Sequence, residues 1–131
     1  MEQKQRMPRP VDIACLVVTI QAALAAVGAV FMGALMVAGP DIPWVAWVLM
    51  LLTLAAGVCG WMLADRMSSR RRRVLASVIA LEAAVFAAGV ASVVEDSDPG
   101  LLSLVNPHLI APVVVTGLLL VPSSARAWFD R

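Results

Sequence analysis

Three polar side chains share one depth inside apolar segments long enough to cross a membrane, and these side chains could carry chemistry. Glu82 is the one ionisable residue deep within such a segment, whereas Gln21 and Thr53 interrupt two others. At about 1.5 Å per helical residue, Glu82 and Gln21 fall about 12 to 15 Å from one membrane face, and Thr53 reaches a similar depth. The sequence therefore predicts an intramembrane polar cluster of Glu82, Gln21 and Thr53.

Two interpretations of Glu82 follow from its depth. An acidic residue at the centre of a bilayer costs about 2.5 to 3.5 kcal/mol, so we expect Glu82 to face protein or water rather than lipid. In the first interpretation it binds a proton or cation in a small transporter or channel. In the second it is a neutral or hydrogen-bonded carboxyl that fixes helix packing.

The segment that holds Glu82 has a second face made of small residues. It comprises Ala76, Ala80, Ala84, Ala87 and Ala91, which lie nearly opposite Glu82 on a helix. Small residues allow two membrane helices to approach closely. Either the face with Glu82 points into the chain's own helices and the alanines contact something else, or Glu82 points at another subunit.

The elements that position these residues are four apolar segments. The chain has 131 residues, of which 61% are hydrophobic and 15% charged, against about 45 to 50% and about 25% in soluble domains. A membrane-spanning helix needs about 20 apolar residues. We therefore predict an all-α polytopic membrane protein: one domain over residues 1–131, with four transmembrane helices as two hairpins over about 11–38, 43–64, 73–94 and 107–121.

Charge segregation predicts the threading of these helices. The basic residues are Lys4, Arg6, Arg9, Arg66, Arg70 to Arg73, Arg126 and Arg131, all at the termini or in the central loop. The other two turns carry acids instead, namely Asp41 in one and Glu95, Asp96 and Asp98 in the other. Because basic short loops stay in the cytoplasm, both termini are expected inside, in the cytoplasmic (inner or plasma) membrane.

Aromatic and basic residues near the helix ends suggest anchors at the interface. Trp44, Trp47, Trp61 and Trp128 are expected at the headgroup level, where tryptophan is enriched. The run Arg70, Arg71, Arg72 and Arg73 is either a topology anchor or a site for anionic lipid headgroups. The anchor alone is sufficient to explain the run.

The sequence lacks the residue patterns that several kinds of chemistry require. With a single histidine, His108, at the expected outer end of the fourth helix, a Ser-His-Asp set cannot be assembled. No Cys or His pair has metal-ligand spacing, and no Gly-Lys loop could hold a phosphate. We expect no enzyme, no cofactor, no metal site and no nucleic-acid partner.

Two sequence similarities bear on the origin of the chain. The segment 118–129, LLLVPSSARAWF, follows an arginine-rich loop and a helix with a central acid, and this layout resembles uncharacterised small four-span membrane proteins of high-GC actinobacteria. That resemblance implies no activity. Within the chain, residues 20–28 echo residues 81–89, which places Gln21 and Glu82 at equivalent positions of two parallel hairpins, or reflects chance among alanine-rich helices.

The function expected from these patterns is structural. The leading hypothesis is a non-enzymatic accessory or scaffold subunit that acts through helix contacts with another membrane protein or in a homo-oligomer. The alternative is a small oligomeric proton- or cation-coupled transporter or channel that uses Glu82. A third hypothesis, a holin that permeabilises the membrane, is suggested only by small size, several spans and a charged tail.

Overall fold

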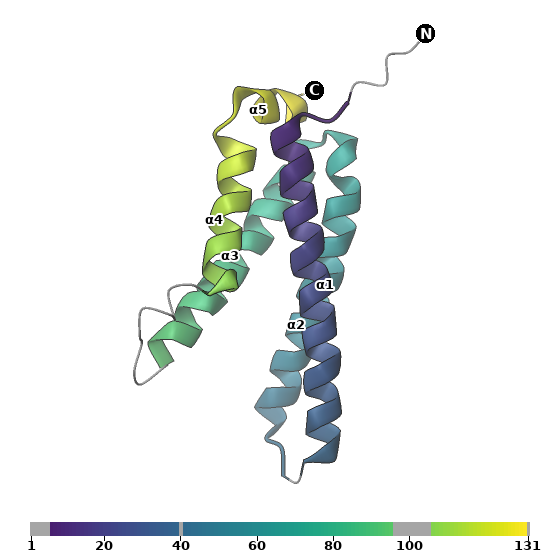
Figure 1. Cartoon of the computed structure of the whole chain (residues 1–131), viewed down its shortest axis with the longest axis vertical. Coiled ribbons are helices and arrows are strands. Elements are labelled where there is room, and N and C mark those ends of the chain that lie inside the picture. Colours follow the sequence, from purple (N-terminus) through teal and green to yellow (C-terminus); the bar gives the residue numbers. More distant parts are fainter. Residues whose placement is uncertain (1–5, 40, 96–105, 131) are drawn as a thin grey trace.

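All regular elements in the described part of the chain are helices. The structure, a computed structural model, describes residues 6–39, 41–95 and 106–130 (Figure 1). Its elements are α1 (Arg9–Ala38), α2 (Trp44–Arg66), the short 3-10 turn η1 (Met67–Ser69), α3 (Arg72–Glu95), α4 (Pro107–Leu120) and α5 (Ser123–Phe129). The first four α-helices begin and end within two residues of the bounds expected from the sequence.

The helix ends follow local stop and start signals. Pro8 precedes α1, and Gly39 ends it in an extended conformation, with its N–H donating to the carbonyl of Leu35 at 3.0 Å. Asn106 caps α4, because its side chain accepts from the backbone N–H of His108 at 2.9 Å. Arg70 adopts a left-handed conformation, with φ of 57°, and thereby turns the chain from η1 into α3.

Three of the helices are long and apolar enough to cross a membrane. They are α1, α2 extended by η1, and α3 as far as Val94. The fourth expected span is shorter: α4 has 14 residues, or about 21 Å at 1.5 Å per residue. It qualifies only together with α5, from which it is bent by 77°. The protein is therefore an all-α, multi-pass membrane protein whose apolar surfaces contact lipid.

The helices pack in a ring of neighbours. α1 packs most extensively against α2, α3 packs against α4, and α1 also contacts α4, whereas α2 and α3 share only a small contact. The first described residues and α5 lie at the same end of the molecule (Figure 1). In the same view, the α1–α2 and α3–α4 pairs diverge toward the opposite end.

Glycines allow the close approach of α1 and α2. A Cβ atom at Gly57 would lie 3.1 Å from the carbonyl oxygen of Ala22 and 3.3 Å from the Cβ of Ala25. At Gly60 it would lie 3.5 Å from the Cβ of Ala22. Gly57 and Gly60 of α2 therefore face Ala22 and Ala25 of α1. Small residues at such a contact let two helix backbones approach closely.

The buried core lies at the end that carries α5. It combines residues from every helix: Val11, Ala14, Val18, Ala64, Met67, Val74, Val78, Val115, Leu119, Ala125, Trp128 and Phe129. Toward the other end, large side chains such as Val30, Phe31 and Leu52 are exposed to the surroundings of the protein. The half of the molecule away from α5 consequently presents mostly lipid-facing surface.

Candidate functional site

Glu82 lies inside the helix assembly and meets one polar partner. Its side chain is 2% exposed on α3, and one of its carboxyl oxygens, Oε2, accepts a hydrogen bond from Nε2 of Gln21 on α1 at 3.3 Å. This distance is longer than the 2.7 to 2.9 Å typical of charge-assisted N–H···O contacts. The pair joins α1 and α3. These two helices make no extensive contact with each other, since α1 packs against α2 and α4, and α3 packs mainly against α4.

The amide of Gln21 has an unfilled hydrogen-bonding position. Its oxygen, Oε1, is buried and has no hydrogen-bond partner among the described residues. A neutral carboxyl carries one O–H, whereas an ionised carboxylate carries none. A protonated Glu82 could supply the missing donor, and a small cation could instead be coordinated by the amide and carboxyl oxygens. The two side chains thus offer a place for one shared proton, whereas a cation would need further oxygen ligands.

Thr53 departs from the predicted cluster. Its hydroxyl donates to the carbonyl of Leu49 in the same helix at 2.9 Å, and its side chain is exposed. The predicted depth does not decide this outcome, because α2 and α3 share only a small contact. Threonine in a membrane helix can satisfy its hydroxyl by bonding one turn back, and Thr53 does so.

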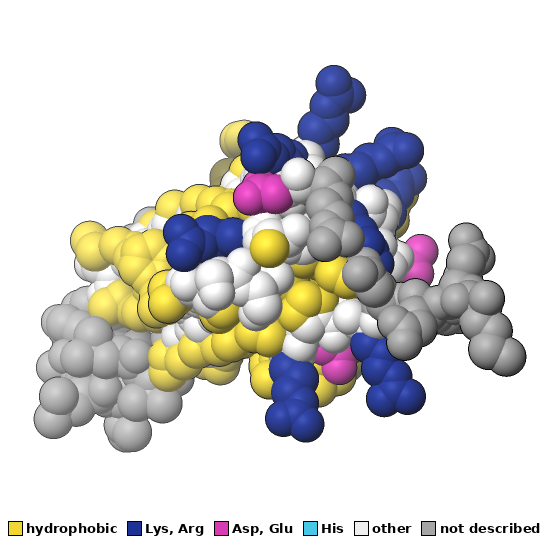
Figure 2. All heavy atoms as spheres, turned by 90° about the horizontal axis from the view of Figure 1, so that it is seen from above, with side chains coloured by type: hydrophobic (Ala, Val, Ile, Leu, Met, Phe, Trp, Pro, Cys, Tyr) yellow, Lys and Arg dark blue, Asp and Glu magenta, His cyan; other side chains and the backbone are white. Residues whose placement is uncertain are grey.

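Arginine side chains surround the end of the molecule that carries α5. Figure 2 views this end and shows basic side chains projecting around its rim. The described arginines with exposed side chains are Arg6, Arg9, Arg66, Arg71, Arg72, Arg73 and Arg126. Lys4 and Arg131 lie outside the described residues. So do Asp96 and Asp98 of the expected acidic turn, whereas Asp41 lies in the α1–α2 turn at the opposite end (Figure 1).

The arginine run is divided among different contacts. The guanidinium of Arg70 lies 4.0 Å from the centre of the Trp128 ring, a cation–π geometry. Arg72 forms an ion pair with Asp130 at 2.9 Å, with side chains that are 76% and 58% exposed. Arg71 and Arg73 are exposed. The four residues therefore do not act as one uniform basic strip.

Trp128 is not an interfacial anchor in this structure. It is only 9% exposed, and its indole N–H donates to the carbonyl of Met67 at 3.2 Å. Apolar side chains of α5 point into the core because Ala125, Trp128 and Phe129 recur at helical spacing after Pro122. The same spacing would also suit a helix on the membrane surface, so the sequence alone did not distinguish the two placements. Trp44 and Trp61 are exposed at 74% and 57%, as lipid-facing side chains are, and Trp47 is half-buried.

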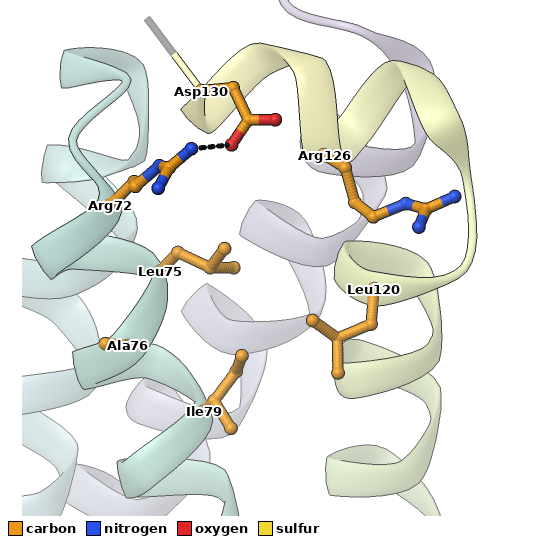
Figure 3. Close-up of a pocket in the computed structure, with 7 residues that line it drawn as sticks. All are labelled: Arg72, Leu75, Ala76, Ile79, Leu120, Arg126 and Asp130. Carbon is orange, nitrogen blue, oxygen red and sulfur yellow. Dashed lines mark hydrogen bonds and ion pairs between the residues drawn. The ribbon is translucent and has the colours of Figure 1, made fainter.

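An open groove beside α5 was not expected from the sequence. It has a volume of about 330 Å³ and lies between α3 on one side and α4 with α5 on the other (Figure 3). Its lining residues are Arg72, Leu75, Ala76, Ile79, Leu120, Arg126 and Asp130. Figure 3 shows Leu75, Ile79 and Leu120 directed into the groove and the Arg72–Asp130 ion pair at one end, while the side chain of Arg126 projects away from it.

No further chemistry gathers in the described ranges. Across residues 6–39, 41–95 and 106–130, no group of three or more His, Cys, Asp or Glu side chains could hold a metal ion. Cys15 and Cys59 are free thiols. Glu82 with Gln21 and the groove beside α5 are therefore the two places where polar groups meet apolar walls.

Comparisons with known proteins identify no family for this chain. No family model, curated protein or solved structure matches its sequence or fold. The layout that resembles actinobacterial four-span proteins therefore assigns neither a family nor an activity. What the protein does has to be argued from its own surfaces.

Proposed function

We propose that this protein is a non-enzymatic accessory or scaffold subunit of the cytoplasmic membrane, which binds another membrane protein through α3. The observation that carries the proposal is the exposure of one complete row of small side chains. Ala76, Ala80, Ala84, Ala87 and Ala91 are all exposed, while Val78 and Glu82 of the same helix are buried. The sequence left two arrangements of this helix open. In the structure Glu82 faces the chain's own helices and the five alanines face outward.

The exposed alanine row suits a helix partner better than lipid. Side chains of one carbon leave the backbone of α3 accessible, so a second helix could approach at short range. Association in a bilayer depends on such packing, because lipid tails are as apolar as leucine. On α1, by contrast, the exposed residues Leu24, Val27 and Phe31 are large, which suits contact with lipid chains.

The proposed orientation has both termini in the cytoplasm. It is supported by the gathering of the described arginines at the end with α5, opposite Asp41 (Figure 2). Single cysteines at Asp41 and Ser68, in a variant with Cys15 and Cys59 replaced by alanine, test it in intact cells. A membrane-impermeant thiol reagent should label the cysteine at position 41 and not that at position 68. The reverse pattern would contradict this orientation.

Purification of the full chain tests the subunit proposal. Wild-type protein extracted from its native membrane in mild detergent should carry a second membrane protein in a fixed ratio. Ala84→Phe should lose that protein, because a phenyl ring separates the two backbones. Ala55→Phe on α2 is the matched control, since Ala55 is also exposed but lies outside the α3 row. A monomer without companions, or equal retention in both variants, would refute the proposal.

A second candidate function rests on the unfilled position beside Glu82. Glu82 is a buried carboxyl next to an amide oxygen without a donor, and acidic residues inside membrane helices often belong to proton or ion pathways. In this case the purified protein should be a homo-oligomer and should conduct protons or cations in liposomes. Glu82→Gln keeps the side-chain shape and should abolish the flux. An equal flux in the variant would exclude the carboxyl from transport.

A further inference from the structure

The groove beside α5 combines charged and apolar walls in one continuous surface. Arg72 and Arg126 rise from α3 and α5 on opposite sides of the mouth, while Leu75, Ile79 and Leu120 form the interior (Figure 3). Its volume of about 330 Å³ is at the lower end of the range of about 300 to 1,000 Å³ for small-ligand sites. The groove is open along its length, so a ligand that enters it need not be enclosed.

From this arrangement we infer that the groove binds one anionic phospholipid, with its phosphodiester between Arg72 and Arg126 and an acyl chain along Leu75, Ile79 and Leu120. The two arginines lie on the side that carries α5 and the other basic side chains, where lipid headgroups meet a membrane protein. The apolar wall runs from there along α3 and α4, two helices whose surfaces contact lipid. A water-soluble phosphate would use only the mouth.

The charges at the mouth favour a singly charged headgroup. Arg72 and Arg126 contribute two positive charges and Asp130 one negative charge, which leaves +1 at the opening. A phosphodiester with an uncharged glycerol headgroup neutralises that charge. A choline headgroup carries its own cation and would bring it toward two guanidinium groups. We therefore expect phosphatidylglycerol to be preferred over phosphatidylcholine.

Asp130 is the ion-pair partner of one of the two arginines. Its Oδ1 accepts from a terminal nitrogen of Arg72 at 2.9 Å. A guanidinium has five N–H donors, so this contact leaves others for a phosphate. The side chain of Arg126 projects away from the ion pair, beside the turn between α4 and α5 (Figure 3). Its long side chain can turn toward the mouth when a phosphate is bound.

The arginine test compares two double variants of equal charge. The purified full chain in neutral detergent is titrated with phosphatidylglycerol or phosphatidylcholine, and bound lipid is counted by native mass spectrometry. Arg72→Gln/Arg126→Gln should weaken phosphatidylglycerol binding at least about 20-fold, since each basic residue contributes roughly a fivefold factor near anionic lipid. Arg71→Gln/Arg73→Gln removes the same charge outside the groove and should change binding less than about twofold. Equal losses in the two variants, or equal binding of both lipids by wild type, would overturn the proposal.

The acyl-chain test fills the groove without changing its charge. Leu120→Trp places a large ring inside the groove, whereas Val121→Trp, at an exposed neighbouring position outside the lining, is the control. Leu120→Trp should lower phosphatidylglycerol binding at least about tenfold and Val121→Trp should not. Glycerol 3-phosphate should fail to displace the lipid. Full displacement by that headgroup, or unchanged binding in Leu120→Trp, would overturn the assignment of the apolar wall. A further outcome would also overturn it: wild type forms a dimer, and Leu120→Trp loses the dimer but keeps its lipid binding. The occupant of the groove would then be a second copy of the chain.

Discussion

The indole N–H of Trp128 donates to the carbonyl of Met67, which connects α5 to the turn between α2 and α3. Met67 is fully buried, and the guanidinium of Arg70 lies over the face of the same Trp128 ring. The last helix of the described chain therefore belongs to the core rather than to the membrane surface. Its removal would take Ala125, Trp128 and Phe129 out of the core cluster that also contains Val11 and Val115.

We predict that Trp128→Ala destabilises the protein by about 3 to 5 kcal/mol, as the loss of a large buried aromatic does in other cores. Trp128→Phe should cost less, about 1 to 3 kcal/mol, since it removes the donor to Met67 but keeps most of the ring. Thermal unfolding of the purified protein in detergent measures both. Trp61→Ala, at an exposed tryptophan, is the control and should change stability much less. Similar losses at positions 61 and 128 would contradict the placement of α5.

Gly57→Val should separate α1 from α2. The added side chain would collide with the Ala22 carbonyl and the Ala25 side chain, and overpacking of this kind costs about 1 to 3 kcal/mol. Gly28→Val introduces the same side chain at a glycine with nothing within 4 Å of the added Cβ. The control should unfold within about 0.5 kcal/mol of wild type. Equal stability of the two variants would show that Gly57 is not at a close helix contact.

The Gln21–Glu82 pair should show strong coupling. Gln21→Leu leaves the buried carboxyl without its one observed partner and should destabilise the protein by about 1 to 3 kcal/mol. Replacing both residues, as Gln21→Leu/Glu82→Leu, should recover much of that loss, because two apolar side chains can fill the site without an unpaired polar group. Additive effects in this double-mutant cycle would mean that the two side chains do not interact.

Asp130→Asn should separate stability from lipid binding. The ion pair with Arg72 is largely exposed, and such pairs contribute about 0 to 1 kcal/mol. Unfolding should therefore shift little, and the shift should shrink further in high salt. Phosphatidylglycerol binding should rise, because the variant removes the negative charge from the mouth of the groove. A fall in binding would mean that Asp130 acts mainly by positioning Arg72.

The helices could be predicted from sequence because their signals are local. Long apolar runs between prolines, Gly39 and Asn106 were enough to place the helix ends closely. The depth of Gln21 and Glu82 could also be counted along their helices. What could not be counted was which face α2 turns toward its neighbours: Thr53 is exposed, and its hydroxyl bonds within its own helix.

The position of α5 shows a second limit of sequence reasoning. Seven residues with an apolar side after Pro122 fit either the headgroup layer or a protein core. The choice depends on whether the turn at Met67 offers a buried surface and a free carbonyl, and those residues are distant in the sequence. The groove between Arg72 and Arg126 arises from the same docking. It could not be foreseen while Trp128 was expected at the headgroup level.

The location of the core has a consequence for biosynthesis. Val11 and Ala14 of α1 pack in one cluster with Ala125 and Phe129 of α5, so a helix that leaves the ribosome before α2, α3 and α4 shares the core with one that leaves after them. While the chain is still being made, the α1–α2 hairpin can insert and pair through its glycines. Its basic end stays incomplete, however, until α5 emerges on the same side. During that interval a membrane chaperone or quality-control protease could recognise the uncovered Met67 surface as the mark of an unfinished protein.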